Sequence, residues 1–505
     1  MERYLHFAAR FSIRNKLIEM PTDISTGLIA LYVAIGGVAL LIMGLNPRWL
    51  PALLVLMMPT GNFDLEGPVT FTLSKIVLLV FVITLPAQIA AAARQARKIW
   101  VPLPLGIFLL VVVISTIGSL AWSGGVSREG FDVLRDPVFR PLVQIVSLCL
   151  RASAFAAIQM WASDDASWAR ICKAALFAST MVAAYGVYQI VGYYNDWPIM
   201  AIHRAQADMS GGYAFFAIGS LNIFRVGSFA GEPKVAAEFL LPSIILIIFA
   251  RSTGIVRLRS WLTSIPILVL HVVVFVLTFA TSSLFGLFLS LPILAYLLWE
   301  LPGRIRLDRL FVALVCLCLA VGALVSLGGG QEIASEIFRA RTTDRIETAD
   351  TPEQASYYYL MDHPQALATG IGWGNASFYL RPYFDPEYYR PLTVSLNSGY
   401  LQILLEGGFP ALVAFLWFLG GSLLSARRTA LGEQDIERRG MITTTLAVCV
   451  VLSAVFAFYG SETQIWVFWG MLVSLSSPEA RSHPASVSAP KSIFNRGLNR
   501  QVSPL

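Results

Sequence analysis

Charged side chains are scarce in this chain of 505 residues. Asp, Glu, Lys and Arg make up 13% of it, whereas 56% of the residues are hydrophobic, and the mean hydropathy is +0.66. A soluble domain has about twice that share of charged residues, so the composition excludes a water-soluble globule. Cysteine pairs are lacking too, because the five cysteines all lie inside apolar runs, without the spacing of a disulfide framework or a metal site: Cys149, Cys172, Cys316, Cys318 and Cys449.

The alternation of a transmembrane β-barrel is also missing, and no segment is long enough to fold as a soluble domain. Continuous apolar runs of the length that spans a bilayer predict helices, which satisfy their backbone hydrogen bonds internally. The sequence therefore predicts an all-α polytopic membrane protein with about 12 transmembrane helices in one membrane domain, residues 1–505. The predicted spans are 24–45, 70–92, 101–121, 140–162, 169–192, 234–250, 261–280, 283–299, 310–327, 396–424, 441–460 and 463–477.

Basic loops predict the orientation, because Lys and Arg near span ends gather on the cytoplasmic side. These loops are 94–98, 251–259, 304–309, 427–439 and the tail, 478–505. Segments 123–139, 193–233 and 328–395 are then outer loops. A shorter apolar run, 48–59, would make 13 spans and place the basic N-terminus outside, so either residues 24–59 form one irregular element or residues 1–20 lie along the membrane surface.

Two further absences concern targeting and partners: a cleavable signal sequence and a nucleic-acid-binding face. The N-terminal region is polar and its first apolar run begins late, so no cleavable signal sequence is expected. The net charge of +6 is accounted for by the predicted cytoplasmic loops. No basic face with interleaved aromatic residues occurs elsewhere, which argues against nucleic acid as a partner.

The first long outer loop ends in RVGSFAGEPKVAAEFLLP, which places charge at the entrance of an apolar span. Pro233 suits the first turn of a helix, so Glu232 is expected at the N-cap and Lys234 in the first turn. Glu238 follows one turn deeper, where ionisable side chains are candidates for function. The alternative is that Lys234 and Glu238 form an i, i+4 pair that only neutralises the entrance.

The large outer loop contains two distinctive segments, HPQALATGIGWGNASFY from position 363 and LNSGYLQILLEGGFPAL from position 396. The glycines at 370, 372 and 374 follow no strand and are expected outside the cell, so they are not a dinucleotide-binding fingerprint. They predict a tight turn that lets the backbone approach a ligand.

These two segments resemble the "HPxxGxGxGN" and "HNxYLxxLxExGxxG" segments of the O-antigen ligase and polymerase superfamily. RVGSFAGEP is similar to the segment before a central span in its polymerase branch. The resemblance covers about residues 100–475, with the motifs in some 60 of them. It implies a helical membrane glycosyltransferase of GT-C type that takes glycan from undecaprenyl diphosphate on the periplasmic face of the bacterial inner membrane, without a metal or other cofactor.

Two departures separate the branches of this superfamily. Leu396 replaces the ligase histidine before Asn397, and Pro410 replaces the final glycine of the second motif. Both weaken the resemblance to ligases, and Glu232 favours the polymerases.

A leaving diphosphate needs cations, and arginine and lysine are the residues that bind phosphate oxygens. The candidates are Arg225, Lys234, Arg341 and Arg345. The acceptor hydroxyl needs a base, for which a carboxylate in a partly apolar vestibule is suitable. Glu232 is the first candidate and His363 the second, although an HP pair before a glycine turn also serves as a plain helix stop.

Aromatic residues suit a sugar-binding cleft, although tyrosines are also common at membrane interfaces. The glycan-binding candidates are Tyr383, Tyr388, Tyr389, Asn397 and Tyr400. Asp385 and Glu387 form a single D-x-E pair, which lacks the further oxygen ligands of a metal site, so no metal is expected.

The sequence thus predicts a polymerase that joins lipid-linked repeat units into O-antigen, capsule or exopolysaccharide. Its partners would be the undecaprenyl-diphosphate-linked glycan and membrane lipid, with chain-length regulator and flippase proteins as further candidates. Transfer of glycan to a lipid A core is the alternative within the same enzyme class. An alternative of another class is a polysaccharide transporter or flippase, in which the buried charges line a path for the substrate.

Overall fold

The computed structural model describes residues 24–60, 72–94, 101–122, 139–161, 164–195, 197–199, 215–218, 221–298, 352–384, 396–458 and 462–477. Eight helices within them are long and apolar enough to cross a membrane: α4 (Leu73–Arg94), α5 (Leu103–Trp122), α6 (Phe139–Trp161), α7 (Asp165–Tyr194), α8 (Pro233–Thr253), α10 (Thr281–Leu298), α17 (Gly399–Gly432) and α18 (Ile436–Phe456). Shorter apolar helices accompany them: α2 (Ile24–Leu45), α3 (Leu50–Met57), α9 (Ile265–Leu277) and α19 (Glu462–Ser476).

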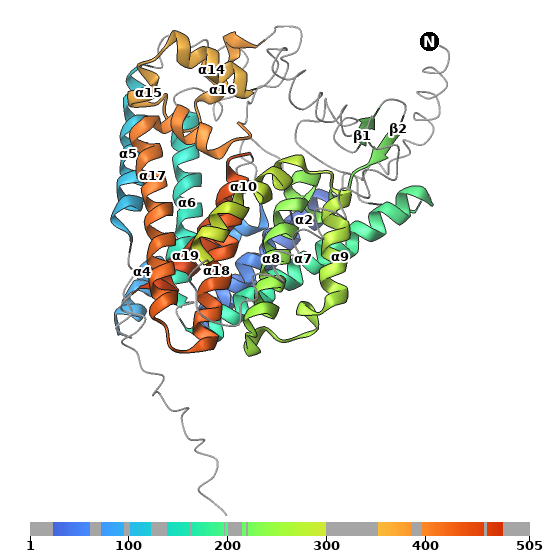
Figure 1. The fold of residues 1–505 in the computed structure, drawn as a ribbon. Coiled ribbons are helices and arrows are strands. Elements are labelled where there is room, and N and C mark those ends of the chain that lie inside the picture. The colour runs from blue at the N-terminus through green and yellow to red at the C-terminus, as the bar shows by residue number, and fades with distance from the viewer. Residues whose placement is uncertain are drawn as a thin grey trace, which may run out of the picture.

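A polytopic helical membrane protein is therefore confirmed, and the helices stand side by side as a bundle (Figure 1). The count of about 12 spans stays a prediction, since the predicted span 310–327 lies outside the described residues. The apolar run at 48–59 corresponds to a 3₁₀ turn, η1 (Pro47–Trp49), followed by the short helix α3. Residues 24–59 thus contain two helices joined by a tight turn.

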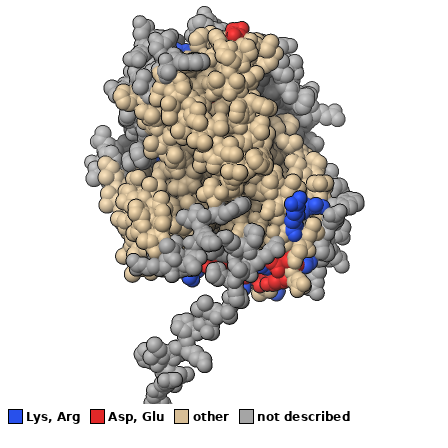
Figure 2. Space-filling model, turned by 90° about the vertical axis from the view of Figure 1, so that its left-hand side faces the viewer, with Lys and Arg blue, Asp and Glu red and all other residues tan. Residues whose placement is uncertain are grey.

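The outer surface of the bundle is apolar. Large side chains such as Ile83, Leu110 and Val146 point outward from their helices and are well exposed. Figure 2 shows a broad face on which the charged side chains gather towards the two ends, while the surface between them is uncharged. A wide apolar band with charged ends is what a bilayer requires of a protein surface.

Helices α8 and α18 form the centre of the bundle. In their apolar segments 78% and 89% of the residues are buried, more than in any other candidate span of the described chain. Polar side chains form hydrogen bonds between the helices. The indole N–H of Trp168 donates to Thr445 Oγ1 at 2.9 Å, and the indole N–H of Trp161 donates to Gln88 Oε1 at 2.8 Å. Such bonds join helices in lipid, where packing supplies little hydrophobic driving force.

One end of the bundle is held by ion pairs. Arg257, in the connection with η7 (Val256–Leu258) and η8 (Trp261–Thr263), contacts Asp165 Oδ2 at 2.6 Å and Glu437 Oε1 at 3.9 Å. Arg438 lies 3.3 Å from Glu433 Oε2. Two of the loops with cytoplasmic basic signatures, 251–259 and 427–439, therefore meet at this end. Which side of the membrane this end faces stays a prediction.

A short β-hairpin accompanies the helices of the predicted all-α fold. Strands β1 (Phe215–Ile218) and β2 (Leu221–Phe224) pair antiparallel, with Phe215 opposite Phe224 and Ile218 opposite Leu221. Both strands lie in the predicted outer loop 193–233, ahead of α8 (Figure 1). Four residues per strand are too few to cross a bilayer, and their Phe, Ile and Leu residues favour extended backbone.

The described part of the large outer loop is ordered by short helices: α14 (Pro352–Asp362), α15 (Ala366–Thr369), α16 (Ala376–Tyr379) and η9 (Arg381–Tyr383). The glycines 370, 372 and 374 between α15 and α16 all have positive φ, from 68° to 86°. A Cβ on Gly372 would lie 2.1 Å from Ser119 Oγ, and one on Gly370 would lie 2.4 Å from the carbonyl oxygen of Glu406. The tight turn is thus confirmed, and its close neighbours in the structure are the membrane helices α5 and α17.

A kink in α17 supplies the partners of this turn. Gly408 has a non-helical φ of 79°, and Pro410 has no N–H to donate to the carbonyl of Glu406, four residues earlier. That carbonyl accepts from Gly372 N and from Ser115 Oγ, both at 2.9 Å, and Leu405 O accepts from Ile371 N at 3.0 Å. The kink thus leaves two carbonyls of α17 without a helical partner, and the glycine turn donates to both of them.

We predict that Gly372→Ala destabilises the protein strongly. The positive φ alone costs about 1–3 kcal/mol, and the close contact with Ser119 adds to it. The thermal unfolding midpoint of the purified protein in detergent measures the effect. Gly118→Ala is the matched control, because a Cβ there meets nothing within 4 Å. Equal midpoints for the two variants would contradict this account of the turn.

Candidate functional site

The segment before α8 is fixed on two sides. Ser228, in the 3₁₀ turn η6 (Ser228–Ala230), has a φ of 51° and is fully buried. Its N–H donates to Gln189 Oε1 at 2.9 Å, and its hydroxyl donates to the carbonyl of Val182 at 2.7 Å, both on α7. On the other side Val226 N donates to Leu277 O of α9 at 3.2 Å. These bonds compensate a strained backbone and set the direction in which the chain enters α8.

Glu232 is the N-cap of α8, as predicted. Gly231 turns the chain with a φ of 78°, and Glu232 follows with extended backbone. Its carboxylate does not cap the helix but lies 3.2 Å from Lys234 Nζ. Glu232 is only 2% exposed, so this is a buried ion pair at a helix entrance.

Lys234 connects this entrance to the second motif segment. Its ammonium group donates to Asn397 Oδ1 at 3.1 Å, across 163 residues of sequence. The backbone N–H of Asn397 in turn donates to Glu353 Oε1 at 2.8 Å, in the first turn of α14. Two of the segments that carry the family resemblance, 225–238 and 396–412, therefore meet in space. We call Arg225, Glu232, Lys234, Asn397 and Glu353 the entrance cluster.

Arg225 lies at the edge of this cluster. Its Nε donates to Thr278 O at 3.1 Å, where α9 ends, and a second guanidinium nitrogen lies 3.5 Å from Phe279 O. Burial lowers the pKa of Arg225, and the nearby carboxylate of Glu232 raises it. Its contacts give Arg225 a structural role beside the predicted one, because carbonyl groups occupy part of its guanidinium fork.

His363 lies apart from the entrance cluster. It follows the last residue of α14, ten residues after Glu353, which corresponds to about 15 Å along a helix. Its ring packs on Tyr359 with centroids 4.8 Å apart, and Gln365 Nε2 lies 3.5 Å from its Nδ1. These contacts agree with the structural alternative, a residue that ends a helix.

The predicted glycan-binding residues fall in different places. The Tyr383 hydroxyl donates to Asp362 Oδ2 at 2.9 Å, and burial together with this bond raises the pKa of Tyr383. Tyr400 is part of the bundle packing, with its hydroxyl donating to the carbonyl of Ser453 at 2.9 Å. Only Asn397 lies in the entrance cluster. Some of the predicted residues lie outside the described residues: Arg341, Arg345, Asp385, Glu387, Tyr388 and Tyr389.

Sequence reasoning missed Glu353 and Gln189. Glu353 follows Pro352, and this pair predicts only the first turn of a helix. It gives no indication of a functional site. Gln189 is a polar residue inside the predicted span 169–192, and that position was the available signal.

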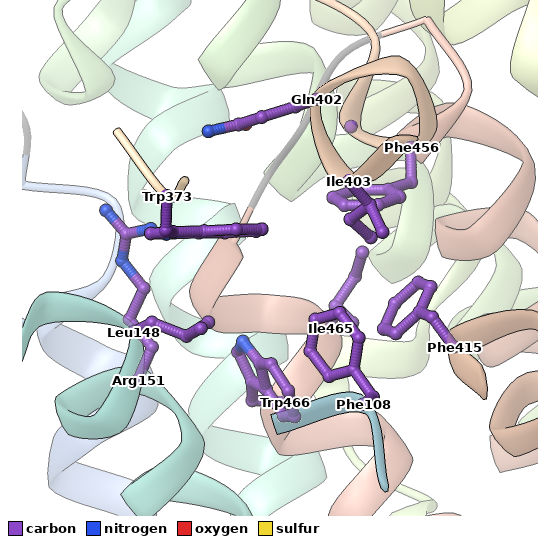
Figure 3. A pocket seen from close by; sticks show the side chains of 11 residues that line it. Phe108, Leu148, Arg151, Trp373, Gln402, Ile403, Phe415, Phe456, Ile465 and Trp466 are labelled. Carbon is purple, nitrogen blue, oxygen red and sulfur yellow. The ribbon is translucent and has the colours of Figure 1, made fainter. Parts of the chain in front are cut away.

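A pocket lies at the first turns of α17, where Gly399, Gln402 and Ile403 line it (Figure 3). Its cavity measures about 30 Å³, it is partly open to the outside, and it is lined mainly by aromatic and aliphatic side chains of α5, α6, α17, α18 and α19. Arg151 of α6 supplies its one charged lining residue. The described residues contain no cluster of three or more metal-ligating side chains, and the absence of a metal stays a prediction.

Comparison with known proteins identifies no relative. The chain matches no protein-family model, and no curated protein matches it. The proposals below therefore depend on the motif resemblance and on the geometry of the cluster.

We predict that Lys234→Met destabilises the protein more than the double variant Glu232→Gln, Lys234→Met. Removing one partner of a buried ion pair costs about 3–5 kcal/mol, and less here because the Lys234 side chain is 23% exposed. Removing both charges avoids leaving an uncompensated carboxylate. The unfolding midpoints of the two variants measure the difference, with Lys173→Met, an exposed residue of α7, as the control. A double variant that loses as much as the sum of both single variants would contradict the pairing.

Proposed function

We propose that this protein is a membrane glycosyltransferase that polymerises lipid-linked oligosaccharide repeat units. The observation that supports this best is the Lys234 ammonium, which contacts both Glu232 and Asn397 and so joins two motif segments of one superfamily. In this proposal the chain lies in the bacterial inner membrane, and the entrance cluster faces the periplasm.

The donor would bind by its diphosphate at the start of α8. The N-terminus of a helix presents N–H groups and a positive dipole end to anions. The Glu232 carboxylate leaves these N–H groups uncapped, and Lys234 adds a formal positive charge next to them. Arg225, whose pKa is raised by the nearby carboxylate of Glu232, is a further candidate cation, as are Arg341 and Arg345.

The carboxylate of Glu232 would act as the base. The acceptor hydroxyl oxygen attacks the anomeric carbon of the donor's reducing-end sugar, and the bond from that carbon to the diphosphate oxygen breaks. The proton of the hydroxyl passes to Glu232, and the lipid diphosphate leaves with the electron pair of the broken bond. Lys234 and the helix dipole stabilise the charge that grows on the leaving group. The amide oxygen of Asn397 accepts from Lys234, and its two amide N–H groups would donate to the sugar.

A reconstituted reaction tests the proposal. Purified protein in lipid should convert a lipid-linked repeat unit into longer lipid-linked glycans without an added energy source. Transfer onto lipid A core, with no elongation of the lipid-linked units, would instead support the ligase. A protein that moves the substrate across vesicles without forming any glycosidic bond would be a transporter.

We predict different effects for the two partners of the ion pair. Glu232→Gln keeps the size of the side chain but removes the base, so turnover should fall roughly 10²-fold or more while the lipid-linked substrate still binds. Lys234→Ala should weaken binding of the diphosphate carrier and also slow turnover. Glu437→Gln, at the opposite end of the bundle, is the control for loss of a carboxylate. Native turnover by Glu232→Gln would make this carboxylate structural.

We also predict that the purified protein keeps its activity in EDTA. The charge of the leaving diphosphate is offset in this proposal by arginine, lysine and a helix N-terminus, so a divalent cation has no role. Glycan formation before and after chelation measures this. Activity that is lost in EDTA and returns only with Mg²⁺ or Mn²⁺ would contradict it and would point to Asp385 and Glu387.

A further inference from the structure

Two arginines meet at the end of the bundle opposite the entrance cluster. Arg170 of α7 donates from one guanidinium nitrogen to the backbone carbonyl of Arg48 at 2.9 Å, across 122 residues of sequence. Arg48 lies in the 3₁₀ turn η1. Helix α7 begins at Asp165, which contacts Arg257 in the connection that follows α8. Since the entrance cluster lies where α8 begins, the two arginines lie towards the other end.

The η1 turn holds Arg48 and Trp49 in fixed positions. Asn46 Oδ1 accepts from the backbone N–H of Arg48 at 3.3 Å, and the carbonyl of Asn46 accepts from Trp49 N at 3.1 Å. The guanidinium carbon of Arg170 lies 4.5 Å from the centroid of the Trp49 ring, which is a cation–π contact. A guanidinium group has five N–H donors in a rigid fork. The carbonyl and the ring therefore orient the fork of Arg170 and leave most of its donors for a ligand.

Neither arginine has a carboxylate partner among the described residues. The acidic residues at the start of α7 are engaged elsewhere, because Asp164 accepts from Ser167 N and Oγ, and Asp165 has its arginine partners in other connections. The Arg48 guanidinium is one side-chain length from the carbonyl that Arg170 contacts, so both groups can reach the same anion. Two like charges this close favour an anion between them, and an arginine fork matches the oxygens of a phosphate group.

The surface next to the arginines is apolar and exposed. Phe177 and Met181 follow Arg170 by seven and eleven residues, which places all three on one stripe of α7. Both apolar side chains are well exposed, as are Leu45 at the end of α2 and Trp49. Arg170 is five residues, about 7.5 Å, from the start of α7, and tryptophan is typical of the membrane–water boundary. The cations thus lie at the level of lipid head groups, and the apolar stripe lies at the level of acyl chains.

We infer that Arg48, Trp49 and Arg170 form a site for the head-group phosphate of an anionic phospholipid. The phosphate oxygens accept from the two guanidinium groups, and an acyl chain lies along Phe177 and Met181. A zwitterionic phospholipid carries a positive group next to its phosphate, which disfavours it beside two cations. In the predicted orientation this site lies in the cytoplasmic leaflet. It is independent of the proposed function, which concerns the opposite end of the bundle.

Lipid titration of the purified full-length protein tests this site. The probe is dioleoyl-phosphatidylglycerol, and native mass spectrometry in detergent measures its affinity. Dioleoyl-phosphatidylcholine has the same acyl chains and should bind the wild-type chain more weakly. Arg48→Gln and Arg170→Gln should each lower the affinity for phosphatidylglycerol about fivefold, and the double variant about 25-fold, as expected for cations near a membrane surface. Millimolar inorganic phosphate should not displace the lipid, because it lacks the acyl chains.

Two further variants separate a built site from general attraction between charges. Arg170→Lys keeps the charge but loses the fork and the stacking on Trp49, so it should still weaken binding. Arg259→Gln is the matched control, because it removes an exposed arginine from loop 251–259 at the same end and should leave the affinity unchanged. The side chain of Arg48 makes no hydrogen bond or ion pair within the described chain. Arg48→Gln therefore decides the question if Arg170→Gln does not fold.

Several results would overturn the site. Equal affinities of the wild-type chain for phosphatidylglycerol and phosphatidylcholine would remove the preference for an anionic head group. An Arg259→Gln variant that loses as much affinity as Arg48→Gln would show diffuse attraction by the whole end of the bundle. Native affinity in the double variant would place the lipid elsewhere. Displacement of the lipid by millimolar phosphate would identify a site for a free anion.

Discussion

The contact of Lys234 with Glu232 and Asn397 is the interaction on which one end of the bundle depends, the end at which α8, α14 and α17 begin. A cation in the first turn of a helix opposes the helix dipole, at a cost of about 0.3–1 kcal/mol. The carboxylate of Glu232 at 3.2 Å and the amide oxygen of Asn397 at 3.1 Å offset that cost. Since Asn397 also reaches Glu353, the starts of α8, α14 and α17 are held in one network. An apolar residue at position 234 would avoid the unfavourable interaction with the helix dipole. It would also remove the contacts that join Glu232 to Asn397.

The attachment of the glycine turn at 370–374 follows from an absent hydrogen-bond donor. Pro410 leaves the carbonyl of Glu406 without its helical partner, and an unpaired carbonyl is expensive in a membrane. Gly372 and Ser115 supply the missing donors. Pro410 thus has a structural consequence, because it gives the glycine turn a carbonyl to bind.

The spans could be predicted from the sequence because lipid demands continuous apolar runs. The predicted span 140–162 corresponds to α6 at Phe139–Trp161, and 101–121 corresponds to α5 at Leu103–Trp122. The N-cap position of Glu232 was also predictable, since Pro233 marks the first turn. Short elements in the loops were not, because the strands β1 and β2 and the helices α14 to α16 have too few residues for a clear period.

The pairing of distant residues in the site could not be predicted either. An i, i+4 partner for Lys234 is visible in the sequence, whereas a contact with Asn397 depends on how α8 and α17 pack. His363 was a candidate base from the sequence because its distance from the other site residues is not visible there. The length of α14 shows how far His363 lies from Glu353. Local rules predict which residues begin a helix, and tertiary packing decides which helix starts meet.

The start of α17 and the two residues before it combine three tasks within ten residues, 397–406. Asn397 contacts Lys234. Gln402 and Ile403 line the pocket that contains Arg151, and the carbonyl of Glu406 accepts from the glycine turn. Gln402 links the last two tasks, because its amide donates to Glu406 Oε2 at 3.0 Å while its side chain lies in the pocket. Residues that share partners in this way do not contribute additively. A change at Gln402 or Glu406 therefore shifts the start of α17 as a unit, and its effect on the pocket cannot be separated from its effect on the contact with Lys234. Arg151 lies on α6 and Lys234 lies on α8. Substitutions at these two residues therefore test the pocket and the contact with Asn397 separately.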